Sequence, residues 1–226
     1  MSTLIDEISL RDKQHVFEDR EEAGLLLAEK LTKYKESGGM VFGIPSGGVP
    51  VASKIASLLN LPIDLIIVRK IQIPFNTEAG FGAMDSDGKV IFNEGLLSQL
   101  RLTEDEIGTQ IKKTMDVIIK RNHLFREGRP YPSLQNKNVI VVDDGLASGY
   151  TMLAAVQFIK RKNPQKIIIA VPTGSKRTID FVLPETDELI CLNVRRRFPF
   201  AVADAYMKWH DLTDKEVLDI LKKVNK

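Results

Sequence analysis

Short apolar runs alternate with longer amphipathic stretches along most of the chain. The apolar runs have the length and aliphatic content of buried strands, and they span residues 40–44, 62–68, 138–143, 166–171 and 187–194. Helical spacing of apolar positions predicts helices at residues 17–34, 50–59, 102–125, 149–163, 174–182 and 213–224. Strands that alternate with helices must run parallel and be joined by right-handed crossovers, so the pattern predicts an α/β fold with a mostly parallel central sheet flanked by helices.

Several stretches carry more specific local signals. Residues 1–16 are polar and aperiodic, which predicts a loose lead-in lying on the body of the fold. Residues 71–88 are rich in glycine and have few periodic apolar positions, which predicts a long mobile loop with a brief strand near 81–84, and a second short strand follows at 89–92. Three helices begin with a possible capping box, formed by the pairs Asp19 and Glu22, Thr103 and Glu106, and Thr213 and Glu216. The helix at 102–125 has an apolar stripe of Ile107, Ile111, Met115, Ile118 and Ile119.

The chain has no internal repeat, low-complexity segment or linker that would divide it. We therefore expect one domain over residues 1–226, with a core of about 38–194 on which an N-terminal helix (17–36) and a C-terminal segment (195–226) pack.

Composition limits the class of protein. The 32 basic and 30 acidic residues leave a net charge of +2, which gives no support for a nucleic-acid partner. The sequence has no apolar run near the roughly 20 residues of a membrane span and no signal-like N-terminus, so we expect a cytoplasmic protein with no membrane partner. A single cysteine, Cys191, rules out an internal disulfide, and the scattered histidines lack the spacing of a zinc site.

The most informative stretch is VIVVDDGLASGYT, residues 139–151. Four aliphatic residues deliver Asp143 and Asp144 to the end of a strand, and a Gly/Ser/Thr loop then opens a helix. Ser148, Thr151 and the loop N–H groups suit a phosphate monoester, because the helix dipole also favours an anion there. The two carboxylates suit sugar hydroxyls and a hydrated divalent cation. The stretch therefore predicts a ribose 5-phosphate site.

Two other loops are expected at the same edge of the sheet, because ligands of open α/β sheets gather outside the carboxyl ends of the strands. These loops span residues 45–50 and 69–82. Arg195, Arg196 and Arg197 follow the last strand, and they fit either a solvated edge or a contact with phosphate or an anionic acceptor.

VIVVDDGLASGYT resembles the PRPP-binding motif of the type I phosphoribosyltransferases. FEDREEAGLLLAEKL, GIPSGGVPVA, VRKI, FNEGL and AVADAYMKWHDLTDKEV resemble one branch of that family, whose acceptor is unassigned. The resemblance covers nearly the whole chain from Phe17 onward. It implies the type I fold with a long helical insertion and a C-terminal hood segment, Mg²⁺ as the cofactor, and a homodimer.

The resemblance also implies roles for individual residues. Asp143, Asp144, Arg69 and Lys70 would form the catalytic group, and the two aspartates would also hold Mg²⁺, mainly through water. The implied 5′-phosphate contacts are Ala147, Ser148, Gly149, Tyr150 and Thr151. The implied pyrophosphate contacts are Ser46, Gly47 and Gly48, with a cis peptide between Pro45 and Ser46. The implied acceptor contacts are Pro172, Thr173, Phe200 and Tyr206. Residues 71–82 would form a flexible lid over PRPP.

Two residues depart from the family pattern. Ser148 replaces threonine but keeps the hydroxyl, whereas Ser46 stands where the branch has arginine and so removes a cation from the pyrophosphate loop. Two functions therefore stay open. One is transfer of ribose 5-phosphate from PRPP to a small nitrogenous acceptor (a purine, pyrimidine or related amine) with release of pyrophosphate, and the other is a non-catalytic PRPP- or nucleotide-binding regulator.

Other nucleotide-binding classes lack their motifs. The chain has no G-x-G-x-x-G of a dinucleotide-dependent oxidoreductase and no G-x-x-x-x-G-K-[ST] of a nucleoside triphosphatase. It also shows no helix-turn-helix pattern or basic face of a DNA-binding regulator.

Overall fold

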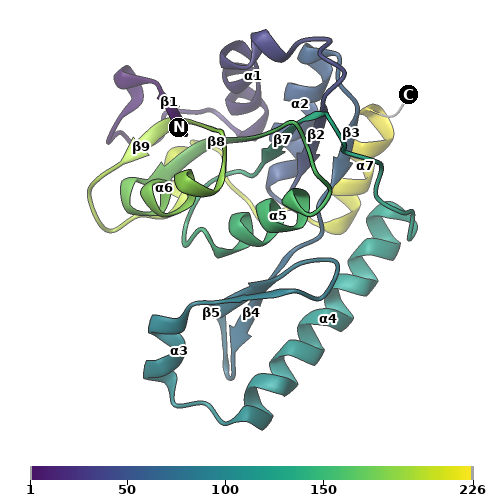
Figure 1. Cartoon of the computed structure of the whole chain (residues 1–226). Helices are drawn as coiled ribbons and strands as arrows, with labels where there is room; N and C mark the ends of the chain where they lie inside the picture. The colour runs from purple at the N-terminus through teal and green to yellow at the C-terminus, as the bar shows by residue number, and fades with distance from the viewer. Residues whose placement is uncertain (1, 225–226) are drawn as a thin grey trace.

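A six-stranded parallel sheet forms the centre of the molecule (Figure 1). The computed structural model describes residues 2–224, without the side chains of residues 77 and 78. In the order β1-β9-β8-β7-β2-β3, the strands are β1 (Thr3–Asp6), β9 (Glu188–Arg195), β8 (Lys166–Ser175), β7 (Asn138–Val142), β2 (Met40–Gly43) and β3 (Ile63–Leu65). The predicted parallel α/β architecture is confirmed.

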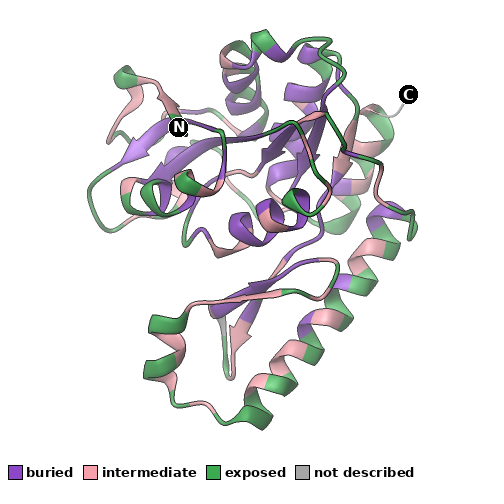
Figure 2. Cartoon of the chain, viewed as in Figure 1, coloured by how far each residue is buried: buried purple, intermediate pink, exposed green. Residues whose placement is uncertain are grey.

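Helices cover both faces of this sheet. They are α1 (Arg20–Lys30), α2 (Gly48–Leu59), α5 (Tyr150–Lys160), α6 (Lys176–Val182) and α7 (Asp214–Val224), with short 3-10 turns η1 (Ile8–Leu10), η2 (Thr32–Tyr34), η3 (Leu183–Glu185) and η4 (Val202–Ala205). Successive residues of β7 point to opposite faces: Val139 and Val141 join an apolar cluster with α5 and α6, and Ile140 and Val142 join one with α1 and α2. The sheet is therefore buried on both sides (Figure 2), as its aliphatic strands require.

The N-terminal lead-in is not loose, contrary to the prediction. Residues Thr3–Asp6 form β1, which pairs in parallel with β9 through a register that sets Leu4 beside Leu189. The strand was missed because its side chains are mostly half-buried at the sheet edge, so its sequence has no long apolar run. Backbone hydrogen bonds to β9 hold β1 in place, and the pattern of apolar and polar side chains gives no sign of them.

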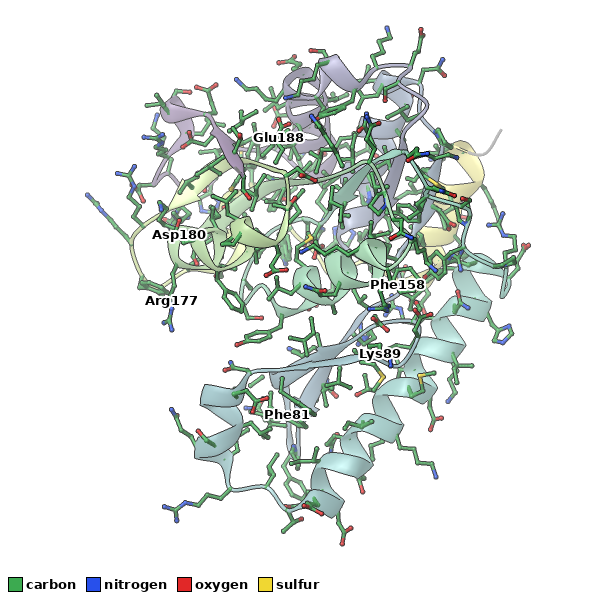
Figure 3. The ribbon with its side chains drawn as sticks, viewed as in Figure 1. Phe81, Lys89, Phe158, Arg177, Asp180 and Glu188 are labelled. Atoms are coloured by element: carbon green, nitrogen blue, oxygen red, sulfur yellow. The ribbon has the colours of Figure 1, made fainter. Side chains whose placement is uncertain are left out.

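Residues 69–126 form an insertion that projects below the main body in Figure 1. It contains an antiparallel sheet of β4 (Arg69–Ile73), β5 (Asn76–Met84) and β6 (Val90–Phe92), followed by α3 (Glu94–Leu100) and α4 (Glu104–Arg126). Phe81 lies inside this insertion (Figure 3), where it shares an apolar cluster with Ile118 of α4. The cluster also contains Leu65 of β3 and Val217 of α7, so the insertion packs on the main body through a shared apolar core.

The prediction of a long loop over residues 71–88 is wrong for most of its length, because β4 and β5 form a hairpin there, whereas the brief strand predicted near 81–84 lies within β5. Its glycines serve close strand contacts. A Cβ on Gly80 would lie 2.1 Å from Cγ of Lys70, and one on Gly82 would lie 2.6 Å from the carbonyl oxygen of Ile91. The glycines in this stretch therefore allow close strand packing and a bulged register. From composition alone, the same glycines suggest a loop.

Helix α4 agrees with its prediction in most details. Thr103 and Glu106 form the expected capping box, and Ile118 is buried. Ile119, predicted on the apolar stripe, is instead 45% exposed. None of the helices within residues 2–224 is both long and apolar enough to cross a bilayer.

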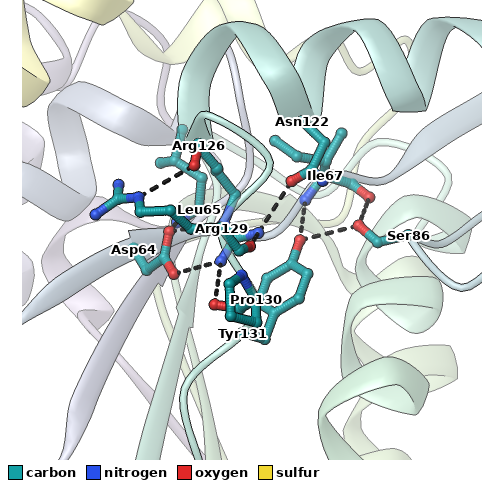
Figure 4. A network of polar contacts seen from close by, with 9 residues as sticks. All are labelled: Asp64, Leu65, Ile67, Ser86, Asn122, Arg126, Arg129, Pro130 and Tyr131. Atoms are coloured by element: carbon teal, nitrogen blue, oxygen red, sulfur yellow. Dashed lines mark hydrogen bonds and ion pairs between the residues drawn. The ribbon is translucent and has the colours of Figure 1, made fainter.

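The C-terminal end of α4 is fixed to the main sheet by a buried ion pair (Figure 4). The guanidinium of Arg126, only 1% exposed, donates from Nε and Nη2 to the two carboxylate oxygens of Asp64 on β3, at 2.9 and 2.8 Å. It also lies 3.6 Å from the ring centroid of Tyr131, whose hydroxyl accepts from the N–H of Ile67 at 3.3 Å. This network sets where the rest of α4 lies relative to the sheet.

Candidate functional site

A cavity of about 600 Å³ lies at the carboxyl ends of β2 and β7, beside the start of the insertion. It brings together seven residues that the sequence singled out: Ser46, Gly47, Arg69, Lys70, Asp143, Asp144 and Thr151. Gln72, from the insertion, also lines the cavity. The two ends of the chain contribute Arg20, Val202, Trp209, Asp211 and Leu212. The predicted loops therefore meet at one site.

Arg20 holds one of the two adjacent carboxylates. Its Nε donates to Oδ2 of Asp144 at 2.9 Å, and its Nη1 donates to the carbonyl oxygen of His210 at 2.9 Å. The guanidinium also stacks 3.8 Å from the ring centroid of Trp209. Sequence reasoning missed Arg20, because a charged residue in the first turn of a capped helix looks like a solvated one.

Burial is the main cost of ionising either carboxyl group. Burial and then the charge of Asp144 hold the pKa of Asp143 well above its usual range. Burial also raises the pKa of Asp144, although Arg20 opposes that change. A neighbouring cation would relieve this repulsion, so the pair fits a divalent metal ion.

The donor set suits Mg²⁺ shared with a substrate. Among the described residues, no group of three or more His, Cys, Asp or Glu side chains could cage a metal. Mg²⁺ is commonly held by one or two carboxylates together with water and substrate phosphates, which is what Asp143 and Asp144 can offer.

Two helices that begin at this site lack the side-chain caps found elsewhere in the described chain. Asp19, Thr103 and Thr213 cap α1, α4 and α7. In contrast, α2 follows Gly47 and α5 follows Gly149, and neither helix has a side-chain cap. The first N–H groups of α5 can therefore serve a bound anion. In α2 the N–H groups of Gly48 and Val49 already donate to the carbonyl oxygens of Ile44 and Ser46, at 3.0 and 3.1 Å.

The loop before α2 packs directly on the acidic pair. The peptide between Pro45 and Ser46 is cis, as predicted. A Cβ on Gly47 would lie 1.9 Å from Oδ2 of Asp144, and one on Gly48 would lie 2.6 Å from the carbonyl oxygen of Val142. Only glycine permits this approach, so the two loops form one continuous surface.

Gly47→Ala is expected to lower the free energy of unfolding by about 1–3 kcal/mol, because the new methyl group must displace Asp144 from its pair with Arg20. Urea denaturation measures this change. Gly108→Ala is the matched control, since no atom lies within 4 Å of its Cβ position on α4, and it should stabilise by about 0.5–1 kcal/mol. Equal effects of the two substitutions would contradict the contact with Asp144.

The insertion contributes two cations to the cavity, Arg69 and Lys70. Burial lowers the pKa of Arg69, and the charge of Asp214 on α7 opposes that change. Lys70, the next residue, is more exposed. Both lie in β4, at the junction of the main body with the insertion.

The structure does not bring the four predicted acceptor residues together at one site. Pro172, Thr173 and Tyr206 have buried side chains and do not line the Asp143 cavity. Thr173 donates to Oδ1 of Asn193 at 2.8 Å, and the Tyr206 hydroxyl donates to the Asp144 carbonyl at 2.6 Å, where it supports the acidic pair. Phe200 does line a cavity, but one that lies outside the Asp143 cavity.

This second cavity, of about 470 Å³, lies beside the loop at residues 147–151. Ala147, Ser148 and Tyr150 of that loop line it together with Phe200 and Arg177. Arg177 and Asp180 mark the outer side of α6 in Figure 3. The arginine run is also divided by the fold, since Arg195 is buried at the end of β9 whereas Arg196 and Arg197 are exposed.

Comparison with known proteins agrees with this geometry. Residues 20–206 match the family model of the phosphoribosyl transferase domain. A Mycobacterium tuberculosis protein, Rv0571c, whose name provisionally places it among the phosphoribosyl transferases, is 33% identical over 211 residues, which are 93% of this chain and 47% of the relative. The chain thus spans about half the length of that relative.

Two further similarities differ in extent. The crystal structure of TT1426 from Thermus thermophilus has 31% sequence identity and a TM-score of 0.74, and the match covers 92% of this chain and 98% of that one. The transcriptional regulator GfcR of Methanococcus vannielii is 26% identical over 110 residues, 45% of this chain and 52% of the regulator. With most of its length matched by the family model, the chain belongs to the phosphoribosyl transferase family.

Proposed function

We propose that the protein is an Mg²⁺-dependent phosphoribosyltransferase that moves ribose 5-phosphate from PRPP to a small nitrogenous acceptor and releases pyrophosphate. One observation carries the proposal. The Asp143–Asp144 pair lies between two helix N-termini without side-chain caps, and the loop before one of them packs on Asp144 itself. PRPP has this pattern of groups, with a ribose diol between a phosphate and a pyrophosphate.

Each part of the site then has a role. The N–H groups and hydroxyls of residues 147–151 hold the 5′-phosphate, and Asp143 and Asp144 accept hydrogen bonds from the ribose hydroxyls. The loop at residues 46–48 binds the pyrophosphate with Arg69 and Lys70. Bound Mg²⁺, held by the two aspartates mainly through water, would supply positive charge to the departing pyrophosphate.

The reaction is a displacement at the anomeric carbon of ribose. The bond to pyrophosphate breaks as the acceptor nitrogen attacks, and the carbon has oxocarbenium character in between. The carboxylates of Asp143 and Asp144 stabilise positive charge on the ribose, and the cations of β4 stabilise negative charge on the leaving group. The acceptor loses a proton, to solvent or to a neighbouring carboxylate.

The acceptor side of the cavity is formed by the C-terminal segment. Val202, Trp209 and Leu212 provide apolar surface, and the carboxylate of Asp211 can accept from an N–H group. We propose a planar heterocycle with an exocyclic or ring N–H as the acceptor class. We also expect a homodimer in the cytoplasm and a single domain over residues 1–226.

A PRPP- or nucleotide-binding regulator is the second candidate. Two points favour keeping it: the partial similarity to the regulator GfcR, and a serine at position 46, where the resemblance to the family implies an arginine. Such a protein would keep the ligand site without turnover.

A panel of purines, pyrimidines and related amines, each offered with PRPP and Mg²⁺, separates the two candidates. The transferase is expected to release pyrophosphate with at least one acceptor, and release should need the acceptor, PRPP and Mg²⁺ together. Calorimetry with PRPP is run beside it. Binding without release from any acceptor would favour the regulator, and no binding would exclude both.

A further inference from the structure

A cation from a distant part of the chain reaches the pyrophosphate loop. The loop's own sequence, PSGGVP, contains no basic residue. In the fold, Nη2 of Arg121 donates to Oγ of Ser46 at 2.7 Å. Arg121 lies on α4 of the insertion, 75 residues away, so no local motif could have revealed this contact.

Arg121 lies close to a second cation, Arg69, and to one carboxylate, Asp214. Its side chain is 16% exposed, and its guanidinium lies 5.0 Å from the ring centroid of Phe125. Burial and then the charge of Arg69 lower its pKa. The nearby carboxylate of Asp214 is 55% exposed and lies 3.5 Å away, so it compensates the two guanidinium groups only weakly.

Part of the hydrogen-bonding capacity of Arg121 is unused. Its Nε is buried and meets no acceptor among the described residues. Arg126, just over one turn later on the same helix, shows what a purely structural arginine looks like here, because both of its donor edges are matched by Asp64, Asn122 and the carbonyl oxygen of Arg129. A buried donor without an acceptor is costly unless a ligand satisfies it.

We propose that Arg121 binds the pyrophosphate half of PRPP and supplies the loop with a cation that its own sequence lacks. This inference rests on the proposed function. The guanidinium lies at the serine of the pyrophosphate loop and is close enough to Arg69 to be perturbed by it, so the two arginines present a paired anion site. Residues of the insertion thereby complete the site built by the main body.

Calorimetry with Mg²⁺ and inorganic pyrophosphate, and separately with ribose 5-phosphate, tests this assignment. Arg121→Gln is expected to weaken pyrophosphate binding by about 10- to 100-fold, the range for losing charge-assisted hydrogen bonds. Ribose 5-phosphate affinity should stay within about 2-fold, because the two loops bind it independently. Lys120→Gln removes an exposed charge from the adjacent position and should change neither affinity.

A rescue variant separates binding from folding. Ser46→Arg added to Arg121→Gln returns a cation to the loop and should restore most of the lost pyrophosphate affinity. Arg121→Lys keeps the charge and the apolar stem, so it should fold normally and lose about tenfold in pyrophosphate affinity through the missing planar fork.

The outcomes are distinct. Unchanged pyrophosphate affinity in Arg121→Gln, or equal losses for both ligands without rescue, would overturn the role of Arg121 and leave the proposed function intact. If the wild-type protein binds none of pyrophosphate, ribose 5-phosphate and PRPP, both the role of Arg121 and the proposed function are overturned.

Discussion

Replacing Asp143 and Asp144 together with asparagine is expected to abolish PRPP binding and, at the same time, to stabilise the unliganded protein. Binding should fall by at least about 100-fold, because the proposed acceptors for the ribose hydroxyls lose their charge and the proposed Mg²⁺ site loses its carboxylates. Stability at neutral pH should rise by about 1 kcal/mol, since the variant no longer holds two adjacent carboxylates in a buried site. Calorimetry and urea denaturation measure the two effects.

The pH dependence of this stability gain has a defined sign. The pKa values of both aspartates are raised in the folded state, mainly by burial, above the ordinary value of 3.8. A carboxyl group of this kind binds more protons in the folded state, so it costs stability as the pH rises through 3.8 toward the higher folded pKa. The gain from the asparagines should therefore be largest at neutral pH and disappear in acid.

Single variants show how much of the stability gain comes from each aspartate. Asp144 is paired with Arg20, so Asp144→Asn also removes a favourable contact, and most of the gain should come from Asp143→Asn. Asp116→Asn, an exposed position on α4, is the control and should leave stability and PRPP binding unchanged. A double variant that is less stable than the wild type at neutral pH, or that still binds PRPP, would contradict the reasoning.

The sequence predicts this acidic site well because its signal is local. Four aliphatic residues, two acids and a small-residue loop are consecutive, and a parallel sheet carries them to the same edge as PSGGVP. The same holds for the capping box at Thr103, whose two partners are three residues apart.

Features set by contacts between distant residues could not be predicted in this way. Arg20 meets Asp144 across 124 positions, and Arg121 meets Ser46 across 75. β1 is ordered by backbone pairing with β9, and the β4–β5 hairpin uses glycines where strands pack closely. In each case the deciding partner is brought in by the fold, and the local pattern suggests solvated charge or loop.

The buried pair of Arg126 and Asp64 connects stability to this site. It fixes the end of α4 to β3, and Arg121 lies five positions earlier on that helix, about 7 Å along its axis. The position of Arg121 beside Ser46 therefore depends on a contact that lies outside the proposed substrate site. Its loss should affect both folding and anion binding.

Arg126→Met is expected to lower the free energy of unfolding by about 3–5 kcal/mol, because it leaves the Asp64 carboxylate without its charged partner. Arg126→Met with Asp64→Leu removes the stranded charge as well and should recover at least about 1 kcal/mol, even though the N–H of Leu65 then loses its acceptor. Arg129→Ala, which removes only the 3.1 Å bond from Nε to the Arg126 carbonyl, should cost less than about 1 kcal/mol. Urea denaturation of the four proteins forms the test. If the double variant is no more stable than Arg126→Met, the loss comes from packing on Tyr131, and charge pairing with Asp64 is not what holds α4 in place.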